Sequence, residues 1–341
     1  MARFRVAISG DFINLDGSPA FFDFDMSSLH SDLDIDLEVV GPRSGIIPAG
    51  ALEGFDALIL MSPRFTAQSV PADGRLALIA RYGVSTDNVD LDACTEAGIA
   101  VSITPDGVRR PVAVSILTYI LALSQRLGIK DRITRLGSEG WAARDHHIGT
   151  GLKGRVLGSL GIGNVGAELY RLAAPLEMEH IAHDPFADPK SAGVCGVRLV
   201  GLDELFARSD FLSVSCPLTD ETRRIVNADR LARMKPTAFL INTARGPIVD
   251  QRALTEALRE GWIAGAGLDV FDHEPTAPDD PLMQMANVIL SPHSICWTDQ
   301  CFADIGACNI DAVEAVRRGE VPHGLANRAV LESAAWRARR G

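Results

Sequence analysis

A glycine-rich run near the middle of the chain restricts the fold more than any other feature. Gly161, Gly163 and Gly166 give the spacing G-x-G-x-x-G. An apolar stretch over residues 156–160 precedes the run and predicts a buried strand, and an apolar pattern of helical period follows it. A second short apolar stretch ends at Asp184. This order of strand, glycine loop, helix, strand and acid predicts a βαβ unit that binds a dinucleotide.

Each glycine has a physical task in such a loop. The first permits a tight turn, the second lets the backbone approach a pyrophosphate, and the third lets helix and strand pack closely. The phosphates would lie on unpaired N–H groups at the start of the helix, where the helix dipole favours negative charge. The residues expected to hold the cofactor here are Gly161, Gly163, Asn164, Val165 and Gly166.

Asp184 predicts which dinucleotide binds. Its carboxylate would accept hydrogen bonds from the adenosine ribose hydroxyls. A 2′-phosphate would be repelled by this carboxylate, and no arginine lies between Asp184 and Lys190 to bind one. NAD(H) is therefore the expected cofactor, in preference to NADP(H).

Length, charge and cysteine content restrict the number of domains, the class of partner and the cellular location that we expect. A chain of 341 residues favours two domains, and a net charge of −11 argues against nucleic acid as a partner. No apolar run approaches the ~20 residues of a membrane span, and the N-terminus lacks the pattern of a signal peptide, so we expect a cytoplasmic protein without membrane contact. The scattered cysteines are expected to be reduced packing residues: Cys94, Cys195, Cys216, Cys296, Cys301 and Cys308.

Apolar runs that predict strands alternate with helical patterns along most of the chain. The runs are short and lack polar alternation, which is typical of strands buried on both faces of a parallel sheet. The expected fold is therefore α/β, with doubly wound parallel sheets. We expect strands at residues 4–9, 37–40, 57–61, 76–82, 99–103, 156–160, 181–183, 211–215, 238–242, 265–270 and 288–291.

Two helical stretches divide the chain into domains. A long apolar helix without internal glycine is expected over residues 112–127, and a second helix over about 299–318. Each would cross between the domains, and residues 325–331 would then rejoin the first domain. We assign residues 1–107 and 299–341 to a substrate domain, and residues 108–298 to the dinucleotide-binding domain.

Residues 11–36 form an acidic and aromatic segment with no clear place in this plan. A calcium loop is excluded because, counting from Asp23 or Asp32, the required glycine and glutamate are absent. Two interpretations stay open. The segment is either a surface excursion whose phenylalanines pack on the domain, or a flap that shapes a substrate pocket. We expect no metal site.

Three predicted strands after the glycine loop end in polar residues. They belong to the segments 240–246, 267–275 and 288–294. Ligands of open α/β sheets bind beyond the carboxyl ends of the strands. If these strands are parallel, their polar residues converge on one site.

These motifs together resemble the D-isomer-specific 2-hydroxyacid dehydrogenase family, including glyoxylate and hydroxypyruvate reductases and enzymes like phosphoglycerate dehydrogenase. The resemblance implies a Rossmann NAD-binding domain, a flavodoxin-like substrate domain with a cleft between them, and a homodimer. It also implies hydride transfer between NAD(H) and a 2-hydroxy or 2-oxo carboxylic acid. The similar stretches run in family order at 81–90, 157–166, 216–222, 234–236, 242–250, 268–275 and 287–293.

The resemblance assigns catalytic roles to three residues. Arg245 resembles the arginine whose planar guanidinium binds the substrate carboxylate. His293 resembles the acid/base that exchanges a proton with the substrate oxygen. Glu274 resembles the carboxylate that orients His293 and raises its pKa by stabilising the imidazolium.

Further contacts also follow from the resemblance. Asp269 resembles the acid that holds the nicotinamide carboxamide, and a first-domain loop would take the substrate carboxylate on its N–H groups. The loop residues are Tyr82, Gly83 and Val84, and the remaining cofactor contacts would be Cys216, Thr222, Thr243 and Ala244.

Two departures from the family pattern concern the substrate pocket. Ser85 stands where the family often has glycine, so the loop is expected to bend differently. Trp297 lies in a stretch that replaces a small, glycine-containing run. Trp297 either walls the pocket and sets substrate size, or anchors the returning helix.

Two other functions stay open at this stage. One is an NAD(H)-sensing regulatory protein, similar to the corepressors built on this fold. The other is a formate- or phosphite-type dehydrogenase, although the glutamine that formate enzymes carry beside the catalytic histidine is not seen here.

Overall fold

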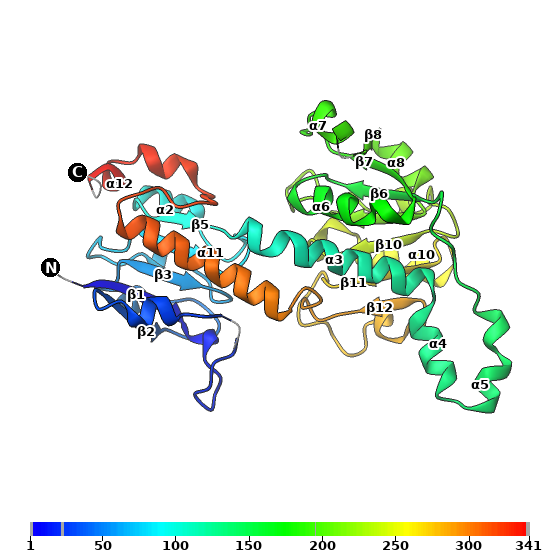
Figure 1. The fold of residues 1–341 in the computed structure, drawn as a ribbon, viewed down its shortest axis with the longest axis horizontal. Helices are drawn as coiled ribbons and strands as arrows, with labels where there is room; N and C mark the ends of the chain where they lie inside the picture. The colour runs from blue at the N-terminus through cyan, green and yellow to red at the C-terminus, as the bar shows by residue number, and fades with distance from the viewer. Residues whose placement is uncertain (1–2, 22–23, 195, 339–341) are drawn as a thin grey trace. The chain divides into compact units, whose positions relative to one another are not determined.

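The computed structural model describes residues 3–21, 24–194 and 196–338. The chain forms two compact units. Unit 1 contains Met1–Val108 together with Trp297–Gly341, and unit 2 contains Arg109–Cys296. Figure 1 labels most of the helices and strands of both units, which are described separately below.

Unit 1 is built on a parallel five-stranded sheet in the order β2-β1-β3-β4-β5. Its central strands are apolar runs whose side chains are buried on both faces, as parallel sheets require. The strands are β1 (Phe4–Ser9), β2 (Ile35–Val40), β3 (Ala57–Leu60), β4 (Leu78–Arg81) and β5 (Ala100–Ser102).

The C-terminal part of the chain returns to unit 1. Helix α11 (Asp299–Arg317) is capped by Thr298, whose hydroxyl accepts a hydrogen bond from the N–H of Cys301. Asn327 then bonds the edge strand, since its side chain accepts from the N–H of Val101. The other helices of unit 1 are η1 (Gly10–Phe12), α1 (Ser27–Ser31), η2 (Ala49–Ala51), η3 (Ala67–Ser69), α2 (Leu91–Glu96), η8 (Arg328–Glu332) and α12 (Ala334–Ala338).

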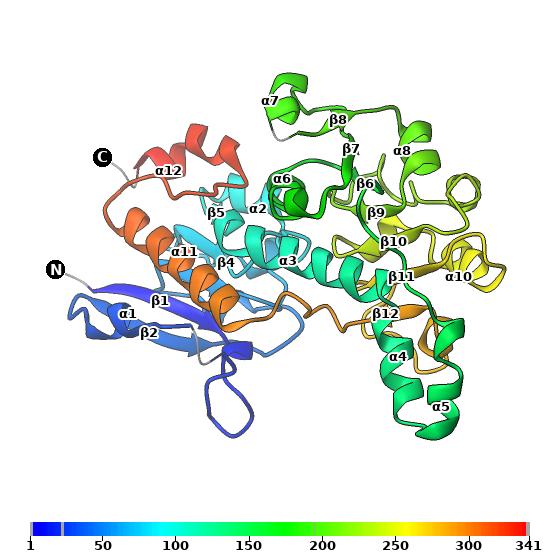
Figure 2. The ribbon, with the colours of Figure 1, turned by 45° about the vertical axis from the view of Figure 1, so that its right-hand side comes forward.

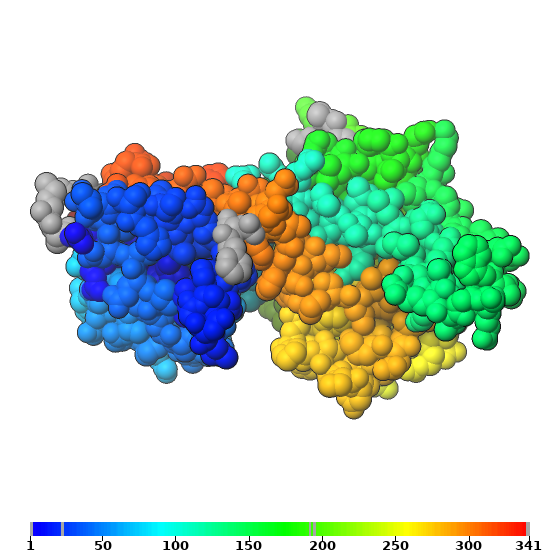
Figure 3. Space-filling view, turned by 60° about the horizontal axis from the view of Figure 1, so that its bottom comes forward, coloured from blue at the N-terminus to red at the C-terminus, as the bar shows by residue number. Residues whose placement is uncertain are grey.

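The segment before α1 contains a small hairpin. Ile13 and Pro19 form an antiparallel bridge around the turn at Gly17, and this dark-blue loop projects from unit 1 in Figures 2 and 3. Phe12 and Phe24 on either side of the hairpin are buried. The phenylalanines at both ends therefore pack on the unit, while Phe22 and Asp23 lie outside the described residues.

Unit 2 is built on a parallel seven-stranded sheet in the order β12-β11-β10-β9-β6-β7-β8. The order reverses at β6, so the carboxyl ends of β6 and β9 border the switch point where ligands of such sheets bind. The strands are β6 (Val156–Leu160), β7 (Glu179–His183), β8 (Arg198–Leu199), β9 (Phe211–Val214), β10 (Phe239–Asn242), β11 (Gly265–Leu268) and β12 (Val288–Leu290).

Helices cover the sheet of unit 2, and α4 and α5 stand away from it (Figure 1). Helix α10 has the strongest amphipathic pattern, with one apolar face buried on the sheet. The helices of unit 2 are α4 (Leu127–Thr134), α5 (Ser138–Ala142), η4 (Arg144–His146), α6 (Asn164–Ala173), η5 (Ala174–Leu176), α7 (Pro189–Val194), α8 (Leu202–Arg208), α9 (Ala228–Leu231), η6 (Gly246–Ile248), α10 (Gln251–Arg259) and η7 (Pro281–Gln284).

Helix α3 (Pro105–Ser124) runs from unit 1 into unit 2. It is the one helix in the described chain that is long and apolar enough to cross a membrane, which the sequence reading did not anticipate. Half of its apolar window is buried inside the protein. Ile116, Tyr119 and Ile120 lie in the core of unit 2, so α3 has the burial of a core helix.

The two parallel sheets confirm the predicted α/β fold class. Several predicted strands differ from the structure by one or two residues at an end, and two elements differ by more. Strand β8, which pairs with β7, was not predicted because its two residues, Arg198 and Leu199, are too few to form an apolar run. Helix α3 begins at Pro105 rather than at residue 112 and includes Gly107, where a Cβ atom would lie 2.8 Å from the Cα of Ile305. Glycine is needed inside this helix because α11 approaches it so closely.

Candidate active site

The glycine loop of unit 2 has the geometry of a tight turn. Gly161 has a φ of +95°, a conformation that L side chains rarely adopt. A Cβ atom there would also lie 2.9 Å from the carbonyl oxygen of Ser215. A Cβ atom on Gly166 would meet the carbonyl oxygen of Gly161 at 3.0 Å. The first and third glycines are therefore required by close backbone packing.

Gly163 differs from its neighbours because nothing lies within 4 Å of where its Cβ atom would be. It is the N-cap residue of α6 and offers no side chain to that helix end. The N–H groups of Asn164, Val165 and Gly166 begin the helix and have no carbonyl partner within it. Open space beside unpaired donors at a helix N-terminus fits the pyrophosphate of a dinucleotide.

Asp184, directly after β7, is hydrogen-bonded to the glycine loop. Its Oδ2 atom accepts from the N–H of Ile162 at 3.0 Å, and its Oδ1 atom accepts from the N–H of Phe186 at 2.9 Å. A carboxylate has further lone pairs, so it can still accept from ribose hydroxyls. The acid and the glycine loop are thus held as one structure.

The end of β9 lies against the glycine loop, while Thr222 belongs to the turn that follows. The backbone nitrogen of Cys216 lies 3.0 Å from the Cβ position of Gly161. Burial raises the pKa of the Cys216 thiol to about 11, so it is protonated at neutral pH. The hydroxyl of Thr222 donates to the carbonyl of Pro217 at 2.7 Å and accepts from the N–H of Thr219 at 2.7 Å. Both of these Thr222 bonds stabilise the turn itself.

The side chain of Asn242 organises the turn after β10. Its carbonyl oxygen accepts from the N–H of Ala244 at 3.1 Å, and its amide donates to the carbonyl of Arg245 at 3.0 Å. Gly246 follows, and a Cβ atom there would lie 1.9 Å from the carbonyl oxygen of Phe271. The backbone that carries Thr243, Ala244 and Arg245 is therefore fixed from two sides.

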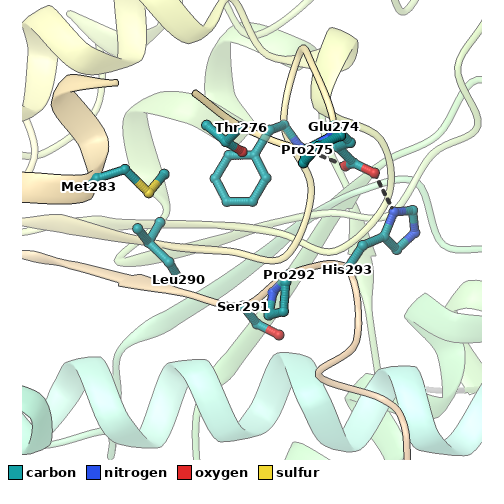
Figure 4. Close-up of a pocket in the computed structure, with 9 residues that line it drawn as sticks. Glu274, Pro275, Thr276, Met283, Leu290, Ser291, Pro292 and His293 are labelled. Atoms are coloured by element: carbon teal, nitrogen blue, oxygen red, sulfur yellow. Dashed lines mark hydrogen bonds and ion pairs between the residues drawn. The ribbon is translucent and has the colours of Figure 1, made fainter. Parts of the chain in front are cut away.

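Glu274 and His293 form the central polar pair of the site (Figure 4). The Nδ1 atom of His293 lies 2.7 Å from Oε2 of Glu274, and Oε1 of Glu274 accepts from the N–H of Phe271 at 2.9 Å. His293 has a φ of +55°, which is uncommon for a residue with a side chain. Strained backbone of this kind concentrates at functional sites.

The pair shifts the pKa of both members. The hydrogen bond to Glu274 raises the pKa of His293, and it outweighs the opposing effect of burial. Burial alone would raise the pKa of Glu274, but the hydrogen bonds from His293 and from the Phe271 N–H outweigh it and lower that pKa. Both shifts favour an imidazolium beside a carboxylate.

Arg245 lies close enough to this pair for its charge to act on both members. Its guanidinium lowers the pKa of Glu274 and also that of His293. The structure therefore brings together three predicted residues that lie far apart in the sequence. A cation beside the imidazole would place a carboxylate-bearing ligand next to a proton donor.

Asp269 is the fourth predicted residue in this region, and it is buried. Its Oδ1 atom accepts from the N–H of Ser294 at 2.9 Å and from the N–H of Ile295 at 3.1 Å. Its negative charge also acts to raise the pKa of His293. Asp269 thus fixes the backbone immediately after the histidine.

A cavity of about 520 Å³ opens beside the pair. Figure 4 shows His293 and Glu274 together at one side of this pocket and Met283 and Leu290 farther from them. The lining is mostly apolar and consists of Phe271, Glu274, Pro275, Thr276, Met283, Leu290, Ser291, Pro292 and His293. The imidazole therefore lies at the rim of an apolar hollow.

The predicted substrate loop lies in unit 1, directly after β4. The N–H of Tyr82 donates to the carbonyl of Leu60 at 2.8 Å, and that of Gly83 donates to the carbonyl of Arg81 at 2.9 Å. None of the described residues accepts from the N–H of Val84. Of the three predicted loop residues, only Val84 has its N–H available for a carboxylate.

One organising residue was missed from the sequence. The sequence predicts Asn242 as the end of a strand and as the first residue of the similar stretch 242–250 without a role of its own, although it carries two of the hydrogen bonds that shape the Arg245 turn. Its signal was a carboxamide at the end of an otherwise apolar run, a position where burial demands partners.

The sequence also predicted that the protein has no metal site and that its cysteines are reduced. The described residues contain no group of three or more histidines, cysteines or acids able to hold a metal ion. The described cysteines are free, and Cys195 lies outside the described residues.

Comparison with known proteins yields one consistent class. Residues 117–294 match the model of the D-isomer specific 2-hydroxyacid dehydrogenase, NAD binding domain. The chain is 36% identical over 307 residues to the glyoxylate reductase of Korarchaeum cryptofilum, covering 89% of this chain and 92% of that protein. It is 38% identical over 286 residues to the glyoxylate reductase of Thermococcus onnurineus, covering 81% and 84%.

The fold comparison agrees with the sequence comparison. The crystal structure of a glyoxylate reductase from Paecilomyes thermophila is similar with a TM-score of 0.78 at 26% identity. The similarity covers 94% of this chain and 98% of that one. Sequence and architecture therefore point to the same class of enzyme.

Proposed function

This chain belongs to the D-isomer specific 2-hydroxyacid dehydrogenase family, and from that premise we propose that it reduces a 2-oxo carboxylic acid to the 2-hydroxy acid with NADH. His293 is the proposed proton donor, Glu274 orients it, and Arg245 binds the substrate carboxylate. The observation that carries this proposal is the Nδ1–Oε2 hydrogen bond of 2.7 Å, with the Arg245 charge acting on both partners.

The hydrogen bond defines which nitrogen of His293 can act. Because Nδ1 is held by Glu274, Nε2 is left to face the substrate oxygen. In reduction, Nε2 of the imidazolium donates its proton to the carbonyl oxygen, and in oxidation the neutral ring removes that proton from the hydroxyl. A bound nicotinamide supplies or accepts the hydride at the carbonyl carbon.

Arg245 would position the substrate for this proton transfer. Its guanidinium can bind a carboxylate through two parallel hydrogen bonds. The carbonyl next to that carboxylate would then be held in one orientation. The Val84 N–H of the unit 1 loop is a further donor that we assign to the substrate carboxylate.

We also propose a preference for NADH over NADPH, because Asp184 is the residue that we assign to the adenosine ribose. Its carboxylate is fixed by the N–H groups of Ile162 and Phe186 and would repel a 2′-phosphate. Asp184→Asn should lower the preference for NADH over NADPH by about tenfold or more, as measured by kcat/KM with each cofactor. A wild-type enzyme that uses both cofactors equally would contradict this assignment.

We further propose a homodimer, with helices α4 and α5 as the arm between subunits. These helices and the residues after them carry apolar side chains that are largely exposed, namely Leu127, Leu136, Trp141 and Ile148. Exposed apolar groups gathered on one projection are typical of an interaction surface. Sedimentation of the wild type at a monomer mass would contradict a dimer.

The central experiment is NADH oxidation with a panel of 2-oxo acids, comparing the wild type with His293→Ala. The variant should bind NADH normally, as followed by fluorescence titration, and lose at least about 100-fold in kcat. Full activity of His293→Ala would contradict the assignment of His293 as the proton donor. Tight NADH binding without turnover of any 2-oxo acid would instead indicate a sensing protein.

A further inference from the structure

Aromatic side chains enclose Tyr82, the first residue of the proposed substrate loop. The ring of Phe12 lies 5.0 Å from that of Tyr82, and the ring of Phe24 lies 5.3 Å from it. The Tyr82 hydroxyl donates to the carbonyl of Phe302 at 3.1 Å. Tyr82 is only 6% exposed, so its side chain anchors the loop and is not available to a ligand.

The segment that supplies these rings is held tightly against α11. A Cβ atom on Gly306 would lie 2.3 Å from Cδ2 of Phe24, so this ring packs directly on the helix backbone. The ring of Phe21 lies 4.7 Å from that of Phe302 on the same helix. Phe12, Phe21 and Phe24 therefore form one packed aromatic cluster with Tyr82 and the start of α11 within unit 1.

One edge of the cluster is left accessible. The Trp297 ring lies 5.9 Å from that of Phe21, nearly perpendicular to it, and 5.5 Å from that of Phe302. Trp297 is 53% exposed although it is the largest side chain in the cluster. Phe21 and Trp297 thus present aromatic surface at the edge, while Tyr82 fills the interior.

The position of Trp297 in the chain links this edge to the reaction. Trp297 follows His293 by four residues, so the two Cα atoms are at most about 14 Å apart for any path of the backbone. At the other end of the cluster, Tyr82 is covalently followed by Gly83 and Val84. Along the chain, Trp297 at the accessible edge is therefore close to the proposed acid, and Tyr82 in the interior of the cluster adjoins the proposed carboxylate-binding loop.

We propose that Phe21 and Trp297 form an aromatic wall against the substrate side chain, and that the preferred substrates are 2-oxo acids with a large apolar or aromatic side chain. This inference rests on the proposed function and names its substrate class. A 2-oxo acid presents its carboxylate and carbonyl to polar groups, which leaves only its side chain to contact apolar surface. Glyoxylate has no side chain and gains nothing from such a wall.

The wild-type enzyme gives the first test, which needs no variant. We expect kcat/KM for NADH-dependent reduction to rise along the series glyoxylate, pyruvate, 2-oxo-4-methylpentanoate and phenylpyruvate, by roughly tenfold or more overall. If glyoxylate were the best substrate of the series, the proposed aromatic wall would be wrong, but the proposed dehydrogenase activity would still hold. No turnover of any member would overturn the proposed function as well, so the two failures are distinguishable.

Variants of Phe21 and Trp297 test whether these two side chains cause the preference for large substrates. Trp297→Ala and Phe21→Ala should each lower the ratio of kcat/KM for phenylpyruvate to that for glyoxylate by about tenfold, and Trp297→Phe should retain most of it. Leu15→Ala is the matched control, because Leu15 lies in the same segment as Phe21 and is 95% exposed. An equal fall for both substrates, or the same change in the Leu15 variant, would overturn the assignment.

Discussion

The side-chain amide of Asn242 donates to the backbone carbonyl of Arg245 at 3.0 Å. Because the same side chain also accepts from the N–H of Ala244, a single buried carboxamide determines the course of the turn that carries the guanidinium. The arginine is thus placed by a residue that has no proposed contact with substrate.

Replacing Asn242 should therefore weaken substrate binding through Arg245. Asn242→Ala removes both hydrogen bonds from the Arg245 turn, at a cost of about 1–3 kcal/mol, and leaves the Arg245 carbonyl with the N–H of Ile248 at 3.3 Å. We expect KM for the 2-oxo acid to rise about tenfold, while the pH profile set by His293 stays in place. Asn287→Ala is the matched control, since this amide bonds backbone carbonyls elsewhere in unit 2. Equal kinetic effects of the two variants would argue against a specific positioning role.

The Glu274–His293 pair predicts a shift in the pH dependence of reduction. Glu274 raises the pKa of His293, so the imidazolium that reduction needs persists to higher pH. Glu274→Gln removes that charge, and the fall in kcat/KM with rising pH should move to lower pH by about 1 unit. Rates of NADH oxidation between pH 5 and 10 measure the shift. An unchanged alkaline limb would show that the limb belongs to another group.

The open space at Gly163 predicts a defect in cofactor binding without a defect in folding. Gly163→Ala places a methyl group in the proposed pyrophosphate cradle and should raise the Kd for NADH about tenfold or more. Gly201→Ala is the matched control, because Gly201 is also a helix N-cap with nothing within 4 Å of its Cβ position. Fluorescence titration and thermal unfolding of both variants separate binding from stability. Normal NADH affinity in Gly163→Ala would place the phosphates elsewhere.

His180 on β7 predicts acid sensitivity of the free enzyme. Its ring is buried, lies 4.9 Å from that of Tyr170, and its Nε2 atom has no hydrogen-bond partner among the described residues. Burial lowers the pKa of His180 in the folded state. Below its ordinary pKa of about 6.5, the unfolded state therefore binds a proton that the folded state resists, and stability falls as the pH falls toward the folded-state pKa.

Urea unfolding between pH 5.0 and 7.5 measures this loss. One proton gives a slope of at most about 1.4 kcal/mol per pH unit, and His180→Leu should reduce the slope of the wild type by up to that amount. The exposed His146 provides the control variant His146→Leu, in which a histidine outside the buried core is replaced in the same way. A slope that persists in His180→Leu would assign the acid sensitivity to other groups.

Much of unit 2 was predictable because its sequence signals are local. The strand before the glycine loop was predicted at residues 156–160 and forms there, since an apolar run bounded by glycines has few other solutions. The convergence of Arg245, Glu274 and His293 could be expected because each follows a parallel strand, and such ends share one edge of a sheet.

The features that escaped prediction depend on distant contacts. Glycine is required at position 107 inside α3 because α11 passes close to it. No local sequence pattern indicates that contact. The aromatic surroundings of Tyr82 join residues that are more than 200 positions apart, as in its bond to Phe302. Asn242 stands out as a carboxamide at the end of an apolar run, but the sequence does not reveal that its partners are the N–H of Ala244 and the carbonyl of Arg245.

The left-handed backbone at His293 has a consequence for attempts to improve this enzyme. A side chain in that conformation costs about 1 kcal/mol, which glycine would recover and asparagine would partly recover. A library screened only for heat resistance would therefore enrich replacements of the very residue proposed to deliver the proton. Thermal stability and turnover therefore compete at this single position, and a search for a more stable enzyme has to select for both at once.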